Sequence, residues 1–100
     1  MLQNKQAQVL YRALVSLNSE EECSRFLEDI CTIKELREIS QRLAVAMALA
    51  EGKNYAVVSA ETGASTATIS RVNRCLMYGS GGYKTIIDRL KEEENDGDQQ

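Results

Sequence analysis

The segment covering residues 54–78, NYAVVSAETGASTATISRVNRCLMY, holds the side chains whose types and spacing best suit recognition chemistry. Its second half joins small and hydroxylated residues to two arginines. Small side chains let a helix lie deep in the major groove of DNA, where hydroxyl and methyl groups meet base edges. Arginines can neutralise the flanking phosphates. The pattern favours a DNA-reading helix; the alternative is a solvated Ser/Thr-rich surface helix with ordinary solubility charges.

Two kinds of DNA contact are expected from this segment and the residue before it. Contacts to base edges are assigned to four residues: Thr66, Ala67, Thr68 and Ser70. Contacts to phosphates are assigned to Arg71, Arg74 and Lys53. Ser65 completes the DNA-binding set. Its side chain can also cap the start of the same helix.

The elements that must position these side chains form a helix-turn-helix at about residues 54–78. Two short helices, 54–62 and 66–78, are joined by a turn in which Gly63 can adopt a positive φ at no steric cost. Ser59 supplies the small residue expected where the two helices touch. The second helix can pack through one narrow apolar stripe, Ile69, Val72 and Leu76, against Tyr55 and Val58 of the first.

Helical signals also cover the rest of the chain. Residues 4–17 carry an apolar stripe, and Ser19–Glu22 and Thr32–Glu35 are capping boxes that open two further helices. The helix from Thr32 should end at Gly52, and a last helix follows the stretch 79–82. The long helix is expected to turn this set inward: Leu36, Ile39, Leu43, Met47 and Ala50. The sequence predicts one all-α domain of about six helices over residues 1–91, followed by an acidic, disordered tail, 92–100.

Charge and composition narrow the classes of function. The net charge is −3, yet residues 32–91 hold nine Lys or Arg against five acids, and residues 92–100 hold five acids and no base. A basic body keeps a nucleic-acid partner open. The chain has no His, no Gly-rich phosphate loop and no metal-ligand spacing, so we expect no enzyme, metal or cofactor. The three cysteines are expected to be small buried hydrophobes.

The run GASTATISR, residues 63–71, resembles the helix-turn-helix of the Trp repressor family, whose core is Gly-Ala-x-x-Ala-Thr-Ile-Thr-Arg. The resemblance extends upstream through Gln41-Arg42-Leu43 to Gly52 and covers roughly residues 28–91. Length and the Arg42-to-Gly52 spacing are most similar to the YerC/YecD branch of Trp-repressor-like proteins. The resemblance implies a six-helix protomer, an intertwined homodimer, and DNA-binding regulation of transcription.

The resemblance also implies positions for a small ligand. In Trp repressor two arginines enclose the indole ring of tryptophan and a threonine touches it; Arg42, Arg71 and Thr32 match these positions. Val72 stands where the family has Gly, and Cys75 where it has Ser. The isopropyl group of Val72 should collide with the indole, so we expect DNA binding without tryptophan as corepressor. Another small effector in this pocket, or tryptophan itself, stays open.

Two other features bear on partners and location. No apolar run approaches the roughly 20 residues of a membrane helix, and no secretory signal is evident, so a cytoplasmic protein without a membrane partner is expected. The acidic total charge and tail oppose DNA. They support the alternative of an all-α protein-interaction module that retains the helix-turn-helix as a scaffold.

Overall fold

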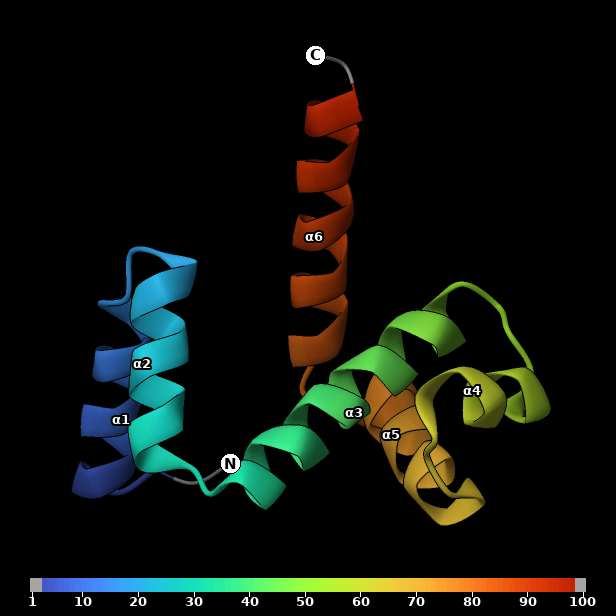
Figure 1. The fold of residues 1–100 in the computed structure, drawn as a ribbon, viewed down its shortest axis with the longest axis horizontal. Coiled ribbons are helices and arrows are strands. Elements are labelled where there is room, and N and C mark those ends of the chain that lie inside the picture. The colour runs from blue at the N-terminus through green and yellow to red at the C-terminus, as the bar shows by residue number, and fades with distance from the viewer. Residues whose placement is uncertain (1–2, 99–100) are drawn as a thin grey trace. The chain divides into compact units, whose positions relative to one another are not determined.

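The computed structural model describes residues 3–98, with side chains described as far as Asn95. Within that range it holds six helices and no strand, which confirms the predicted all-α fold (Figure 1). The helices are α1 (Lys5–Val15), α2 (Glu20–Ile30), α3 (Ile33–Ala50), α4 (Tyr55–Thr62), α5 (Thr66–Tyr78) and α6 (Gly82–Asp98).

Hydrogen bonds at the helix caps explain where α2 and α3 begin. The Ser19 hydroxyl accepts a hydrogen bond from the Glu22 backbone N–H at 3.1 Å, while the Glu22 carboxylate accepts from the Asn18 N–H at 2.9 Å. At the start of α3 the exchange is reciprocal. The Glu35 N–H donates to the Thr32 hydroxyl at 3.0 Å, and the Thr32 N–H donates to the Glu35 carboxylate at 2.9 Å. The capping box at Thr32 and Glu35 is therefore confirmed, and Ser19 is confirmed as the cap of α2, but Glu22 accepts from Asn18 rather than from Ser19, so the box at Ser19 is not complete.

The chain divides between Leu36 and Arg37 into two compact units. The N-terminal unit contains α1 and α2. Of its described residues only Ala7 is buried, while several large apolar side chains of α1 are exposed: Val9, Leu10, Tyr11, Leu14 and Val15. Packing inside this unit thus leaves much of its apolar surface uncovered. The single domain predicted over residues 1–91 stays a prediction.

The C-terminal unit has one apolar core to which every helix of the unit contributes. Its buried residues are Val45, Ala46 and Ala48 of α3, Val58 of α4, Ala64 of the turn, Ile69 and Val72 of α5, and Ile87 of α6. Alanines on α3 allow helices to approach closely, and β-branched side chains from α4, α5 and α6 fill the space between them. This core is what holds the helix-turn-helix against α3.

The face of α3 that turns inward differs from the expectation. Ile39 is 44% exposed and Ala50 is exposed, while Val45, Ala46 and Ala48 are buried. The inward assignment of Ile39 and Ala50 is therefore wrong for the single chain. The reason is that α3 carries apolar residues on more than one side, and the core of its unit covers Val45, Ala46 and Ala48, with Met47 and Leu49 packed against it, but not Ile39 or Ala50.

Helix α6 continues through residues 92–98 of the acidic segment. Glutamate is a good helix former and the chain has no proline, so nothing local stops the helix after Lys91. The predicted disorder of residues 92–100 stays a prediction for the protein in solution, and its last two residues lie outside the described part of the chain.

Candidate nucleic-acid interface

The turn between α4 and α5 has the geometry that the sequence predicts. The Asn54 side chain caps α4 by accepting from the Val57 N–H at 3.0 Å. Gly63 ends α4 with φ of 75°, a conformation that side chains rarely adopt, and its N–H donates to the Ser59 carbonyl at 2.8 Å. Ser65 then caps α5. The two helices are thus joined by a turn of only three residues.

Side-chain hydrogen bonds brace this turn from both ends. The Thr62 hydroxyl donates to the Val58 carbonyl at 2.7 Å and accepts from the Ala64 N–H at 3.2 Å. The Ser59 hydroxyl donates to the Ala64 carbonyl at 2.9 Å. Ser59 is therefore present at the helix contact for its hydroxyl as well as for its small size. These contacts limit the rotation of α5 relative to α4.

Helix α5 has an inner face of core residues and an outer face open to a partner. Ile69 and Val72 are 0% and 1% exposed, and Leu76 packs against the same core. Thr66, Ala67, Arg71 and Arg74 are exposed, while Thr68 and Ser70 are half-buried. Thus four residues of α5 that are assigned to DNA are exposed, as is Ser65 before it. The predicted apolar stripe is confirmed, and its expected partner Val58 is buried, whereas the other expected partner, Tyr55, is 37% exposed.

Ser65 and Thr68 form a small hydroxyl pair at the start of α5. The Thr68 N–H donates to the Ser65 hydroxyl oxygen at 3.2 Å, and the Ser65 hydroxyl donates to the Thr68 side-chain oxygen at 3.2 Å. In this arrangement the Thr68 hydroxyl accepts from Ser65 and keeps its own proton to donate. Ser65 therefore orients Thr68 as well as capping the helix.

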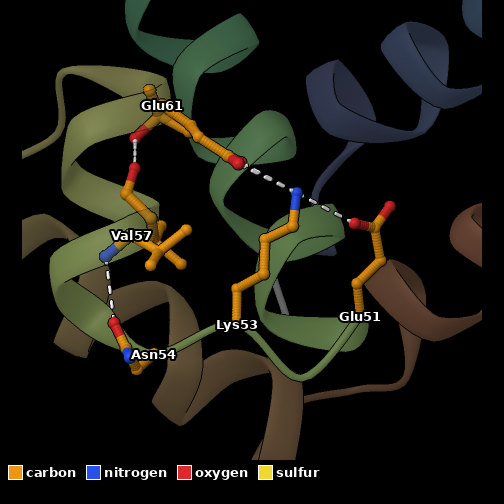
Figure 2. A network of polar contacts seen from close by, with 7 residues as sticks. Glu51, Lys53, Asn54, Val57 and Glu61 are labelled. Atoms are coloured by element: carbon orange, nitrogen blue, oxygen red, sulfur yellow. Dashed lines mark hydrogen bonds and ion pairs between the residues drawn. The ribbon is translucent and has the colours of Figure 1, made fainter.

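Lys53 is held by two carboxylates. Its ammonium group lies 2.9 and 3.1 Å from the two Glu61 oxygens and 3.1 Å from a Glu51 oxygen (Figure 2). These hydrogen bonds, first the one to Glu61 and then the one to Glu51, raise the pKa of Lys53 because they stabilise its charged form. A phosphate would have to compete with both acids for this charge. The ion pairs of residues 3–95 involve neither Arg71 nor Arg74.

The residues assigned to a ligand pocket are only partly brought together. A cavity of about 630 Å³ between α3, the end of α5 and the start of α6 is lined by Arg42 and Cys75, with apolar walls from Ile39, Leu43, Tyr83 and Ile86. Arg71 does not line it. Thr32 belongs to the N-terminal unit and serves as a helix cap.

Val72 fills core space, as the sequence led us to expect. Its side chain is 1% exposed and belongs to the cluster with Val45, Val58 and Ile69. Cys75 differs from expectation because it is exposed, and Cys23 and Cys31 are only half-buried. All three cysteines carry free thiols in the structure.

Gln41 is a contributor to the turn that sequence reasoning missed. From α3 its side-chain amide donates to the Thr62 carbonyl at 3.2 Å. No local signal could have found it, because Gln41 lies one helical turn before the buried Val45, on a face of α3 that the apolar pattern did not assign to the core. Within the described range no helix is long and apolar enough to cross a membrane. Those same residues hold no group of three or more metal-ligating side chains.

Comparisons with known proteins agree on one family. Residues 5–91 match the family described as Trp repressor protein. The uncharacterized protein YerC of Bacillus subtilis (strain 168) is 50% identical over 95 residues, which are 95% of this chain and 91% of YerC. A candidate Trp repressor from Staphylococcus aureus has a TM-score of 0.86 at 43% identity, covering 89% of each chain. A TrpR-like protein from Eubacterium eligens ATCC 27750 has a TM-score of 0.87 at 46% identity, covering 90% of this chain and 93% of its own.

Proposed function

This chain belongs to the Trp repressor family, and from that premise we propose that it is a sequence-specific DNA-binding regulator of transcription. Helix α5 reads the major groove. The observation that carries the proposal is the division of α5 into a buried face, Ile69 and Val72, and an exposed polar face that includes Thr66 and Arg74. An exposed helix with small polar side chains, fixed to a scaffold by its other face, suits insertion into the groove.

The residues of the polar face divide into two roles. Thr66, Ala67, Thr68 and Ser70 contact base edges near the start of α5. Arg71 and Arg74, both exposed and outside the ion pairs of residues 3–95, contact phosphates. Lys53 contributes to the phosphate contacts if DNA displaces it from Glu61 or Glu51.

The regulator works without tryptophan as corepressor. Arg71 matches the second arginine that encloses tryptophan in Trp repressor. The space next to it holds the side chain of Val72, which is buried in the core of the same unit. A ligand could enter that space only if Val72 moved out of the core and lost its packing in the cluster with Val45, Val58 and Ile69. A different small effector remains an alternative occupant for the cavity at Arg42 and Cys75.

The active form is a homodimer in the cytoplasm. Support comes from the N-terminal unit, where Leu10, Leu14 and Val15 are 38–85% exposed and only Ala7 is buried. Apolar surface of this extent is normally covered by a partner. Two copies of α5 would read two half-sites separated by roughly one DNA turn, about 34 Å.

Two substitutions on α5 test the proposal. Arg74→Ala should weaken binding by a similar factor on all duplex sequences and reduce the salt dependence, because it removes a phosphate contact. Thr68→Ala should change the preferred sequence, since it removes a base contact. Binding by selected and random duplexes, titrated at several salt concentrations, separates the two effects. If Thr68→Ala altered neither affinity nor preference, α5 would not be the reading helix.

The competing candidate is a protein-interaction module that keeps the helix-turn-helix as a scaffold. The observation that favours it is the net charge of −3. The two candidates differ in the salt dependence of DNA affinity. Several phosphate contacts require the affinity to fall steeply with salt, whereas a protein-binding module has no such contacts to lose.

A further inference from the structure

Gln41 is the side chain through which α3 holds the helix-turn-helix turn by a hydrogen bond. It lies 21 residues before Thr62 in sequence, yet its amide nitrogen is 3.2 Å from the Thr62 carbonyl oxygen. Because a carbonyl oxygen only accepts hydrogen bonds, the NH₂ group of Gln41 must be the end of the amide that faces it. The contact is partly buried, so water competes with it less than at the open surface.

The acceptor is a group that α4 cannot satisfy by itself. Thr62 is the last residue of α4, and the last four carbonyls of a helix lack partners within that helix. At this end the next residue, Gly63, turns the chain away with φ of 75°. Gln41 supplies from another helix the donor that the chain reversal removes.

The position of this carbonyl affects the start of α5. Only Gly63 and Ala64 separate Thr62 from Ser65, the cap of α5. Ser65 in turn orients Thr68 through two hydrogen bonds. A shift of the turn would therefore be transmitted directly to the end of α5 that is assigned to base contacts.

The support of Gln41 is itself rigid. Val45 lies one helical turn farther along α3 and is fully buried, and Ala48 continues the same face. Gln41 thus extends from an anchored stretch of helix toward a turn that is exposed at Gly63 and Ser65.

We propose that Gln41 is a positioning residue for DNA recognition, which holds the turn so that α5 presents Ser65 and Thr68 in one orientation. The inference rests on the proposed function and deepens it: an amide on α3, outside the helix-turn-helix, sets the affinity of the reading helix. A residue that merely filled space at this point would tolerate replacement by an apolar side chain of similar length.

Two variants of the full chain separate the hydrogen bond from packing. Gln41→Met keeps the length of the side chain and has no donor. Gln41→Glu keeps the shape and can donate only when its carboxyl is protonated. Gln8→Glu, on the exposed surface of α1, is the control for the added charge.

The first readout needs no DNA. The NMR resonance of the Thr62 carbonyl carbon should move in Gln41→Met, and the amides of Gly63 and Ala64 should exchange with solvent about 3- to 10-fold faster, as expected for one lost hydrogen bond. In Gln41→Glu the carbonyl resonance should return toward its wild-type position as pH falls from 8 to 4, because an ordinary glutamate carboxyl becomes protonated near about pH 4.3. The Gly63 N–H and Ala64 N–H keep their own acceptors, so the change reports on the carbonyl contact.

The second readout is affinity for a duplex that the wild-type chain binds. Gln41→Met should bind about 3- to 10-fold more weakly. Gln41→Glu should be similarly weak at pH 8 and recover as pH falls, relative to Gln8→Glu. The chain has no histidine, so no side-chain imidazole titrates over this range in the wild type. A packing role would give no such recovery.

The outcomes distinguish this inference from the proposed function. Wild-type binding with unchanged affinity in Gln41→Met would overturn the inference alone. An unmoved Thr62 carbonyl resonance would overturn it as well. A wild-type chain that bound no duplex DNA would overturn both proposals.

Discussion

Replacing Ser65 by aspartate separates the stability of α5 from its use in DNA binding. Ser65 caps α5, and its hydroxyl oxygen accepts from the Thr68 N–H at 3.2 Å. Aspartate caps helices about as well as serine, and its charge is favourable at a helix N-terminus by about 0.3–1 kcal/mol. Ser65→Asp should therefore unfold at the wild-type temperature or slightly above, whereas Ser65→Ala should lose about 1 kcal/mol of stability.

The same charge should weaken DNA binding. If the start of α5 enters the groove, the new carboxylate comes within about 7 Å of phosphates, and their repulsion is about 0.6–2.4 kcal/mol for an effective dielectric constant between about 80 and 20. That range corresponds to about a 3- to 50-fold loss of affinity. The slope of log affinity against log salt should also become shallower by about 0.9, the contribution of one neutralised phosphate.

Thermal unfolding and DNA titration of the same samples measure the two effects. Ser65→Asn, a neutral cap, should keep both stability and most of the affinity. Ser19→Asp is a matched control, because Ser19 caps α2 through an equivalent 3.1 Å hydrogen bond outside the helix-turn-helix. The reasoning is refuted if Ser65→Asp folds normally and binds DNA as tightly as Ser19→Asp does.

Three further predictions concern the core, a cap and the pocket. Ile69→Ala should lower the free energy of unfolding in urea by about 2–5 kcal/mol, because Ile69 is fully buried; a loss below about 1 kcal/mol would contradict the assigned core. Hydrogen bonds with the Thr32 backbone N–H and hydroxyl lower the pKa of Glu35 below its ordinary 4.5. The wild-type chain should therefore be more stable than Glu35→Gln above pH 4.5, and this difference should disappear as pH falls through the lowered pKa. Unfolding midpoints across the acid range test this, and a constant difference would argue against the capping box. The chain has no Trp, so the fluorescence of added L-tryptophan reports its own binding. With Val72 in place, no saturable fluorescence change is expected at micromolar tryptophan. A saturable change would overturn the proposal that the regulator works without tryptophan as corepressor.

Features set by neighbouring residues were predictable from the sequence. Ser19 and Thr32 cap helices through residues three positions away, and the structure confirms both. Gly63 was predictable because the turn needs a positive φ that glycine alone adopts without strain. Ile69 and Val72 followed from the helical period of apolar residues.

Features set by distant residues were not predictable in this way. The inward face of α3 was misassigned at Ile39 because several faces of α3 are apolar, and only tertiary packing selects among them. The Gln41 contact joins residues 21 positions apart, and no local pattern encodes such a pair. The engagement of Lys53 by Glu61 depends on the path of the loop between α3 and α4. The DNA contacts of individual residues stay predictions.

Selection of random duplex DNA by the purified full chain, at about 0.15 M salt and without added metabolites, tests the central claim most directly. The account predicts enrichment of a two-fold-symmetric site whose half-sites lie roughly one helical turn apart, and weaker enrichment of that site by Ser65→Asp. A folded protein that enriches no sequence over the starting pool would contradict it.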